Sequence, residues 1–316
     1  MQYDVVIIGD LVVDLIVPIE RLPLEPERHG WADGIFVEPG GAGNLLIAAR
    51  RLNLATATIG ALGDDDYGSR MLAMLAEEGV DVQHALKCPG RSTVCCMVIT
   101  DRIGQHVFLG IKDGLGTWPL GPSWPDVIAQ TRSLFLDGYT VRDLLGDEDL
   151  RTLLALIDRA TAPFFFDPGP SAEFIPPERM AQVLAVVDVL LLTEQEAAHL
   201  VSGATPEQMA QALLARGPQV VVLKRGAAGC LVATPGEQFA LPAFEVEVVD
   251  TVGAGDAFAA AFIAGYVRSG SLRDCAALGN AMGALVTTRR GAGRRIPSRA
   301  DLLAFLAGHP RLQALA

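Results

Sequence analysis

A glycine-rich turn followed by an acid occupies residues 250–258, which read DTVGAGDAF. Apolar residues after the turn, including Phe258, Phe262 and Tyr266, recur at helical spacing, and Gly270 ends the pattern. The turn therefore lies at a helix N-terminus, where free N–H groups and the helix dipole favour an anion. The carboxylate of Asp256 would repel that anion, unless it accepts a proton from a group that attacks it. A simple helix cap is the alternative interpretation.

A second glycine-rich stretch, EPGGAGNLLIAARRLN, covers residues 38–53. Its glycines permit a close backbone approach, and Asn44 offers both a donor and an acceptor to a hydroxyl-rich ligand. A glycine turn with an Asn cap is the alternative. Asp14 lies among apolar neighbours in LVVDLIV, so we expect its carboxylate to be paired, and a sugar diol would suit it.

Two familiar nucleotide-binding motifs are excluded or weak. The sequence contains no G-x-x-x-x-G-K-[ST], which excludes a P-loop protein. In GAGDAF, Phe258 stands where a dinucleotide fingerprint needs a small residue, so a Rossmann interpretation is weak.

Composition indicates one large globular unit. Of 316 residues, 50% are hydrophobic and 20% are charged, with a net charge of −12. This acidic balance argues against nucleic acid or an acidic membrane as the main partner. The five cysteines have no paired metal-binding spacing, and the first residues, MQYDVVIIGD, resemble a strand rather than a signal peptide. No apolar run approaches the ~20 residues of a membrane span. We therefore expect a cytoplasmic protein.

Short apolar runs alternate with amphipathic helical patterns along most of the chain. This alternation predicts an α/β fold with a doubly wound, mostly parallel sheet and helices on both faces. In such sheets ligands bind outside the carboxyl ends of the strands. The predicted strands are 5–9, 57–63, 133–138, 163–168, 188–193 and 219–226.

Two regions interrupt the alternation. Residues 10–39 and 92–112 contain short strand patterns and no good helix, and DRIG separates a hairpin in the second region. We interpret both as a small antiparallel β flap inserted in a single domain of residues 1–316. Edge strands of one sheet are the alternative.

Taken together, the motifs resemble the ribokinase-like (PfkB) carbohydrate kinase family. DTVGAGDAF is similar to its C-terminal signature, and GGAGN to its N-terminal one. Further similarities follow in the family's order over nearly the whole chain, at GDLVVD, TEQE (193–196), KRGAAG (224–229) and GNAMGALVTTRRGA (279–292).

The resemblance implies an ATP-dependent kinase that phosphorylates a hydroxyl of a sugar or sugar-like substrate. Asp256 would be the general base, and the backbone N–H groups of Gly253, Ala254, Gly255 and Asp256 would form the anion hole. It also implies Mg²⁺, held by Glu196 through water. The residues implied at the nucleotide are Thr193 (where the family usually has Asn), Lys224, Gly226, Gly229 and Asn280, although Asn280 could equally be a packing residue.

On the acceptor side the resemblance implies Asp14, Gly41, Asn44 and Gly138. The chain departs from the family pattern at Leu46 and Asn53. Many relatives hold a monovalent cation, so K⁺ near Asp250, Val252 and Gly291 is an expectation. The arginine run at 289–295 is interpreted as a solvated surface, with direct phosphate contact as the alternative.

Alternative functions stay open at this point. A nucleoside kinase on the same fold could use Trp31 and Phe36 to stack on a base. A catalytically silent relative would usually have lost the GAGD turn. Phosphosugars are disfavoured because residues 10–18 and 38–46 contain no Lys or Arg. We further expect the flap to close over the acceptor as a lid and to pair two subunits in a homodimer.

Overall fold

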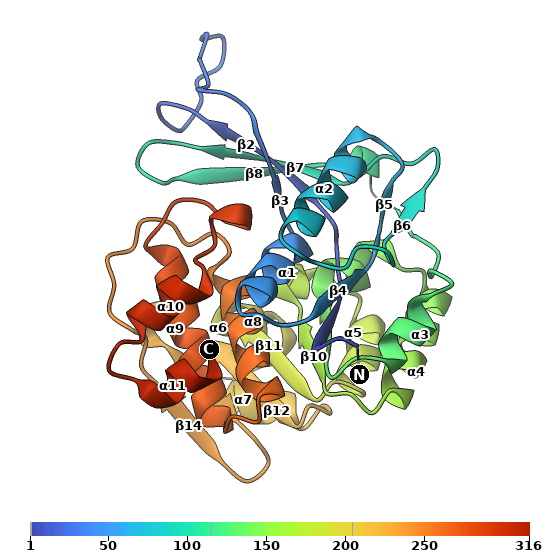
Figure 1. Ribbon diagram of the computed structural model, residues 1–316, viewed down its shortest axis with the longest axis vertical. Helices are drawn as coiled ribbons and strands as arrows, with labels where there is room; N and C mark the ends of the chain where they lie inside the picture. The colour runs from blue at the N-terminus through green and yellow to red at the C-terminus, as the bar shows by residue number, and fades with distance from the viewer. Residues whose placement is uncertain (1, 115, 204) are drawn as a thin grey trace.

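A central sheet organises the fold (Figure 1). The computed structural model describes residues 2–114, 116–203 and 205–316. The eight strands follow the order β14-β13-β12-β11-β10-β9-β1-β4. They are β1 (Val5–Ile8), β4 (Thr56–Ile59), β9 (Leu134–Asp137), β10 (Phe164–Asp167), β11 (Val189–Thr193), β12 (Val220–Lys224), β13 (Cys230–Ala233) and β14 (Gln238–Leu241).

Five of the six predicted strands are present as single strands, the predicted strand 57–63 is divided at Gly60 into β4 and a strand of another sheet, and the mostly parallel sheet is confirmed. Within this sheet, the neighbours in the order β12-β11-β10-β9-β1-β4 all pair in parallel. At one edge β13 and β14 add an antiparallel hairpin, which the sequence had not indicated. A separate parallel pair joins β5 (Ala61–Gly63) to β6 (Leu86–Cys88).

Each central strand is buried on both faces. In β10, Phe165 packs into one hydrophobic core, while Phe164 and Phe166 pack into the other. Because side chains alternate across a strand, a continuous apolar run such as FFF supplies both cores at once. All five cysteines are free thiols.

Helices cover both faces of the sheet. One face receives α1 (Ala42–Arg51), α2 (Asp66–Glu77), α8 (Ala254–Val267), α9 (Leu272–Thr287), α10 (Arg299–Phe305) and α11 (Pro310–Leu315). The other receives α3 (Trp124–Ala129), α4 (Asp147–Arg159), α5 (Pro177–Leu184), α6 (Glu194–Leu200) and α7 (Pro206–Leu214). Within the described residues no helix is long and apolar enough to cross a membrane.

Short helical turns complete the fold. The 3₁₀ turns are η1 (Lys112–Gly114), η3 (Gly169–Glu173), η4 (Gly226–Ala228) and η5 (Gly293–Arg295), and η2 (Thr140–Leu144) is a π-helical turn.

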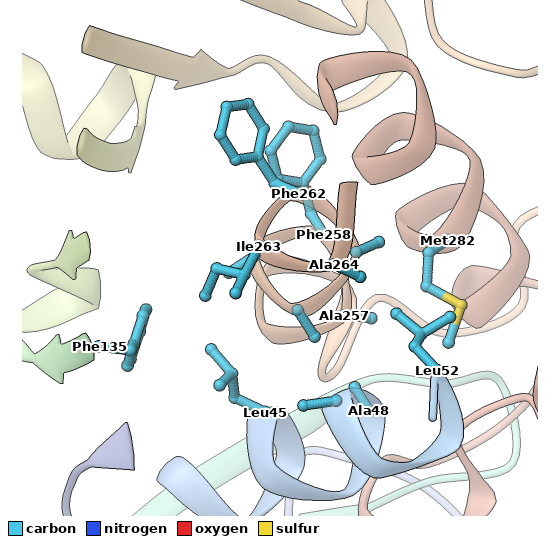
Figure 2. Close-up of a cluster of buried hydrophobic side chains, with 14 of the residues drawn as sticks. Leu45, Ala48, Leu52, Phe135, Ala257, Phe258, Phe262, Ile263, Ala264 and Met282 are labelled. Atoms are coloured by element: carbon cyan, nitrogen blue, oxygen red, sulfur yellow. The ribbon is translucent and has the colours of Figure 1, made fainter. Parts of the chain in front are cut away.

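Helices α1 and α8 pack against each other in the larger core (Figure 2). Helix α8 is buried over most of its circumference, and Ala257, Ala264 and Ala48 of the facing helix are all fully buried. Small side chains let the two backbones approach closely, while Leu45 and Leu52 fill the space beside them. This packing fixes the N-termini of α1 and α8 relative to each other.

The flap is a second, four-stranded sheet with the order β3-β2-β7-β8, and it projects at the top of Figure 1. Its strands are β2 (Val13–Pro18), β3 (Phe36–Pro39), β7 (Cys95–Thr100) and β8 (His106–Ile111). Two of its pairings are antiparallel, as expected, but β2 and β7 pair in parallel. The chain leaves the flap after β3 and re-enters it at β7, and β7 runs in the same direction as β2.

Candidate active site

The GAGD turn leads directly into α8. Gly253 caps the helix in the left-handed region (φ 76°), and a Cβ there would lie 2.8 Å from Ala292 Cβ. The helix begins at Ala254, so Gly255 and Asp256 belong to its first turn rather than to the bend before it, where the sequence interpretation had put them. Helix α8 has no side-chain N-cap, which leaves its first N–H groups without the usual partner.

The N–H groups of this turn are mostly free. Among the described residues no acceptor binds the N–H groups of Gly253, Gly255 or Asp256. The N–H of Ala254, by contrast, donates to the Thr251 carbonyl at 3.2 Å. The turn therefore offers three unengaged donors at the positive end of a 14-residue helix.

The carboxyl group of Asp256 lies among other charged groups. Burial, followed by the charge of Asp167, raises its pKa to about 7, against the opposing effects of Lys224 and Asn44. A carboxylate with a pKa near neutrality can take up a proton under ordinary conditions and release it again.

Asp14 on β2 faces this group from the flap. Burial raises its pKa to about 7, with a second contribution from the charge of Asp256. A Cβ on Gly40 would lie 2.3 Å from the Asp14 carboxyl carbon, so glycine is needed for the carboxylate to sit against that turn. Two carboxylates from opposite ends of the sequence thus share one environment.

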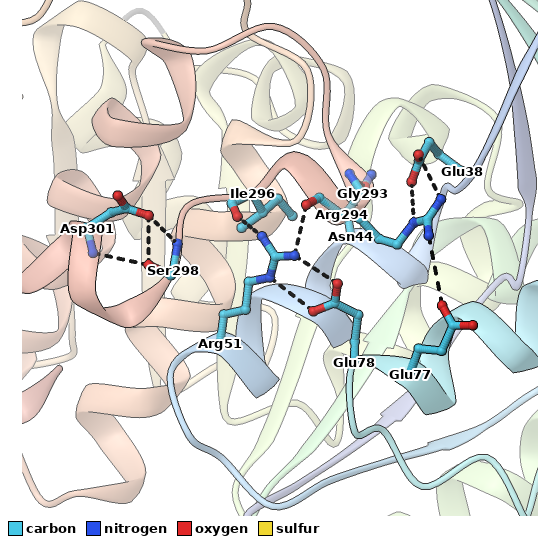
Figure 3. Close-up of polar contacts among 10 residues, drawn as sticks. All are labelled: Glu38, Asn44, Arg51, Glu77, Glu78, Gly293, Arg294, Ile296, Ser298 and Asp301. Atoms are coloured by element: carbon cyan, nitrogen blue, oxygen red, sulfur yellow. Dashed lines mark hydrogen bonds and ion pairs between the residues drawn. The ribbon is translucent and has the colours of Figure 1, made fainter.

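Asn44 connects the two glycine turns. It is 6% exposed, its side chain is near enough to Asp256 to lower the pKa of that group, and its Oδ1 accepts from the Gly293 N–H at 2.8 Å. Figure 3 shows Asn44 beneath the Gly293 segment. Gly41 precedes it with φ 50°, and a Cβ there would lie 2.6 Å from the Asp10 carbonyl. The sequence had suggested Asn44 as a cap, but α1 has no side-chain cap.

A buried ion pair lies on the other side of Asp256. Lys224 Nζ, at the end of β12, contacts Asp167 Oδ2 at 2.5 Å, and both side chains are about nine-tenths buried. Lys224 is also next to Gly255, since a Cβ there would be 3.5 Å from Nζ. The nearby carboxylates Asp167 and Glu196 keep the pKa of Lys224 raised despite the opposing effect of burial. Sequence reasoning missed Asp167.

Glu196 and Thr193 form a capping box at the start of α6. The Glu196 N–H donates to Thr193 Oγ1 at 3.1 Å, and Glu196 Oε2 accepts from the Thr193 N–H at 2.7 Å. Thr193 therefore caps the helix although the family usually has Asn there. Burial, followed by the charge of Asp167, raises the pKa of Glu196.

The remaining nucleotide-side residues occupy different surroundings. Gly226 and Gly229 have φ of 55° and 82°; a Cβ on Gly226 would meet open space, but one on Gly229 would lie 2.0 Å from the Leu241 carbonyl. Asn280 is 7% exposed and donates to the Pro242 carbonyl at 3.0 Å, which is a packing contact. Gly138 is buried, and a Cβ there would lie 2.0 Å from the Pro168 carbonyl oxygen.

Two further acids that sequence reasoning missed lie at strand ends. Asp137, which ends β9, accepts from the N–H groups of Asp10 and Thr140 at 2.7 Å each. Asp10 is 6% exposed, its Oδ1 has no partner among the described residues, and burial raises its pKa well above the usual range. The signal for both Asp137 and Asp167 was available: each is an acid at the carboxyl end of a parallel strand.

Asp250 joins two loops behind the GAGD turn. Its Oδ1 accepts from the Val252 N–H at 3.0 Å and its Oδ2 from the Gly291 N–H at 2.8 Å. Among the described residues no backbone N–H donates to the carbonyls of Val252 or Gly291. Gly291 has φ 80°, which lets the loop turn sharply at this point.

A cleft of about 180 Å³ runs between the flap and the segment 290–295, and Asp14 lines it. Phe36 also lines the cleft, but Trp31 does not and is 89% exposed. The cleft thus joins the acceptor-side residues to the C-terminal loop.

Comparisons with known proteins identify the family of this chain. The model of the pfkB family carbohydrate kinases matches residues 2–299. The chain is 28% identical to the ATP-dependent ribose-1-phosphate kinase of Halopiger xanaduensis, covering 94% of this chain and 96% of that protein. It is 30% identical to a fructokinase of Klebsiella pneumoniae, covering 94% and 97%.

Solved structures share the fold. The structure of Arabidopsis thaliana ribokinase complexed with ribose and ATP superposes with a TM-score of 0.81 at 25% identity, covering 97% of this chain and 99% of that one. A ribokinase-like protein from E. coli in complex with ATP and Mg²⁺ has a TM-score of 0.79 at 23% identity, covering 97% and 99%.

The raised pKa of Asp256 predicts a specific pH dependence of stability. The folded protein holds this proton up to about pH 7, whereas the unfolded chain releases it near pH 4, so stability falls as pH rises through that window. Asp256→Asn cannot ionise, and we expect its free energy of unfolding at pH 8 to exceed that of the wild type by about 1–2 kcal/mol. Urea unfolding between pH 4.5 and 8 measures the difference.

The exposed Asp33→Asn variant controls for loss of a carboxylate. If Asp256→Asn loses stability with rising pH as steeply as the wild type does, the carboxyl group is not the source of the effect.

Proposed function

The chain belongs to the pfkB family of carbohydrate kinases, and from this we propose that it transfers the γ-phosphoryl group of ATP to a sugar hydroxyl with Asp256 as general base. One observation carries the proposal. A carboxyl group whose burial raises its pKa to about 7 lies beside unengaged N–H groups of a helix N-terminus and opposite a second carboxylate on the flap.

The deprotonated Asp256 accepts the proton of the acceptor hydroxyl as its oxygen attacks the γ-phosphorus. The O–P bond to the acceptor forms while the bond to the bridging oxygen of ADP breaks. Asn44 holds the carboxylate in place. Protonated Asp256 then returns its proton to solvent after the products leave, which a pKa near 7 permits.

Charge on the transferring group is stabilised by the GAGD turn. The free N–H groups of Gly253, Gly255 and Asp256 point from the helix N-terminus, and they act without reorganisation in a buried site. Because the Ala254 N–H already donates to Thr251, its share in the anion hole requires that this 3.2 Å bond yields. Lys224, next to Gly255, supplies a positive charge to the phosphates.

The nucleotide and Mg²⁺ fit the residues between β10, α6 and β12. Glu196 and Asp167 are neighbouring carboxylates, and the described residues contain no cluster of three metal-ligating side chains. Mg²⁺ commonly uses one or two carboxylates, several waters and substrate phosphates, so a pair is sufficient. Bound Mg²⁺ would neutralise phosphate charge. In this proposal the nucleotide lies at the turn of Gly226 and Gly229, where the position of Gly226 is open, and Asn280 lies near its base.

The acceptor occupies the cleft beside Asp14. Asp14 lines this cleft, and in the proposal Asp14 and Asn44 offer acceptors and a donor to sugar hydroxyls while Gly41 contributes its backbone. Gly138 packs against Pro168, and we propose that it contributes only its backbone to the acceptor site. Trp31 lies outside the cleft, which favours a sugar over a nucleoside whose base it would stack on.

A monovalent cation fits behind the anion hole. The carbonyls of Val252 and Gly291 have no backbone donor among the described residues, and Asp250 holds both segments together. Bound K⁺ would place positive charge near the turn that receives the phosphoryl group.

The flap is proposed as both lid and pairing surface. Its hairpin turn touches the body of the protein, because Arg290 donates to the Arg102 carbonyl and a Cβ on Gly104 would lie 3.1 Å from the Val249 carbonyl. Edge strand β8 exposes Val107, Leu109 and Ile111 by 47%, 57% and 38%, all on one face of the flap. An exposed apolar edge of this kind favours association with a second subunit.

The two carboxylates are expected to separate binding from chemistry. Asp256→Asn should lower kcat by ~10²–10⁴-fold with ATP binding retained, since it removes the base. Asp14→Ala should raise the KM of the acceptor by about 10–100-fold and leave the KM of ATP nearly unchanged, because only hydroxyl hydrogen bonds are lost. Steady-state kinetics with Mg-ATP and a neutral sugar test both. Near wild-type turnover by Asp256→Asn would refute the base assignment.

Dependence on K⁺ is a separate prediction. Replacing K⁺ by tetramethylammonium should lower turnover severalfold, and K⁺ should raise the melting temperature, because it binds only the folded protein. Asp250→Asn should abolish both responses. A wild-type protein indifferent to K⁺ in both measurements has no such site.

Hydrogen exchange tests the two proposed roles of the flap. A saturating acceptor should slow exchange in residues 28–41 and 93–110 if the flap closes, and dilution should speed exchange in 106–111 if β8 pairs subunits. A response to dilution alone would leave pairing as the only role. A response to neither would contradict both.

A further inference from the structure

Three arginines from distant segments enter the acceptor cleft. Arg102, from the flap hairpin turn, and Arg290 and Arg295, from the C-terminal loop, all line it. Arg290 donates to the Arg102 carbonyl, and the stem of Arg295 folds over Gly291, where a Cβ would lie 3.2 Å from its Cδ. The stretches 10–18 and 38–46 contain no Lys or Arg, but the cleft receives its positive charge from elsewhere in the chain.

These arginines differ from their neighbours in the same loop. Arg289 pairs with Asp301 at 2.9 Å, and Arg294 pairs with Glu38 at 3.0 Å and Glu77 at 3.9 Å, as Figure 3 shows for Arg294. In the described part of the chain, no carboxylate lies within ion-pair distance of Arg102, Arg290 or Arg295. Within this loop, Arg289 and Arg294 form ion pairs with carboxylates of the fold, whereas Arg290 and Arg295 line the cleft without such a pair among the described residues.

Most carboxylates that line the cleft are already engaged. Asp101 accepts from the N–H groups of three flap residues, which lowers its pKa. Asp250 accepts from Val252 and Gly291, and Glu38 pairs with Arg294. Only Asp33, exposed at the flap, and Asp14 at the proposed reacting end remain. Asp101 and Asp250 keep their negative charge, because backbone N–H groups bind the ionised carboxylate. None of these carboxylates pairs with Arg102, Arg290 or Arg295, so the three guanidinium groups are available to an anionic ligand.

The arginines lie away from the reacting end. Along the flap, Asp14 is opposite Cys96, whereas the hairpin turn follows Thr100, four residues or ~13 Å further along the strand. The segment 290–293 spans this length, because Arg290 touches the turn while Gly293 binds Asn44. A sugar ring is shorter than that span, so an acceptor that reaches both ends carries a substituent beyond its ring.

We propose that the acceptor is an anionic sugar, whose phosphate or carboxylate group is bound by Arg290 and Arg295 while its reacting hydroxyl lies between Asp14 and Asp256. The guanidinium groups bind the anionic group through paired, charge-assisted hydrogen bonds. Arg102 adds a third positive charge from the flap, so the anionic end of the acceptor holds the flap turn against the body. This inference rests on the proposed kinase function and names its substrate class.

Matched acceptors and variants test the inference. The wild type is assayed with Mg-ATP on ribose and ribose 1-phosphate, fructose and fructose 6-phosphate, and glucose and gluconate. We expect kcat/KM for at least one anionic acceptor to exceed that of its neutral counterpart by tenfold or more. The phosphate and carboxylate arms decide which anionic group the arginines bind.

Arg290→Gln and Arg295→Gln should each raise the KM of that anionic acceptor by about 10–100-fold, with kcat, the KM of ATP and turnover of the neutral sugar unchanged. Arg295→Lys should recover part of the loss. The matched control, Arg289→Gln, comes from the same loop but lies outside the cleft and should behave as the wild type. Added salt should raise the KM of the anionic acceptor more than that of the neutral one.

The possible failures are distinguishable. A wild type that prefers the neutral sugar in every pair, or an Arg295→Gln variant that loses neutral and anionic acceptors equally while remaining folded by thermal unfolding, overturns the inference and leaves the kinase proposal intact. A wild type that phosphorylates neither kind of sugar overturns the proposed function and this inference together.

Discussion

The site depends on one imbalance of charge. Lys224 is a single buried cation among Asp167, Glu196 and Asp256, and it contacts Asp167 at 2.5 Å. The remaining carboxylates are left without full compensation, so burial and mutual repulsion raise the pKa values of Glu196 and Asp256. Partial protonation or a bound cation would stabilise this site, because either reduces the repulsion between its carboxylates. It is therefore less stable than a neutral core would be, which is a common cost of positioning reactive groups.

Rigid packing makes this strained arrangement possible. Asp256 and Asn44 come from α8 and α1, whose small side chains allow close contact in the larger core (Figure 2). The ends of these helices also hold the C-terminal loop: Arg51 of α1 donates to the carbonyls of Ile296 and Arg294 while it pairs with Glu78 at 2.8 Å (Figure 3). Asp256 and Asn44 therefore lie on helices that are packed into the core and tied to this loop, whereas Asp14 lies on the flap.

The C-terminal loop contacts the flap, the acceptor side of the site and the loop behind the anion-binding turn. Gly293 binds Asn44, Gly291 binds Asp250, and Arg290 reaches the flap turn. A change at the acceptor cleft can consequently be felt at the anion-binding turn through short hydrogen-bonded steps. The fold places the nucleotide residues on strands of the main sheet, and the acceptor residues between that sheet and the flap.

Local patterns in the sequence determined much of this molecule. The FFFD and VVVLK runs could only be central strands, and GAGD before an alanine-rich run could only be a helix start, because periodicity and glycine conformation are local properties. Residue chemistry singled out Asp256, Asp14 and Asn44, and the family motifs suggested their roles. Their shared environment was not readable, since Asp14 and Asp256 are joined only by folding. The position of Asp167 at the end of a strand was readable from the sequence, but its ion pair with Lys224 and the burial of Asp10 were decided by folding. Tertiary structure alone decided that β2 pairs in parallel with β7. It also decided that, among the described residues, Arg289 and Arg294 form ion pairs with carboxylates whereas Arg290 and Arg295 do not. Both depend on where distant segments of the chain meet.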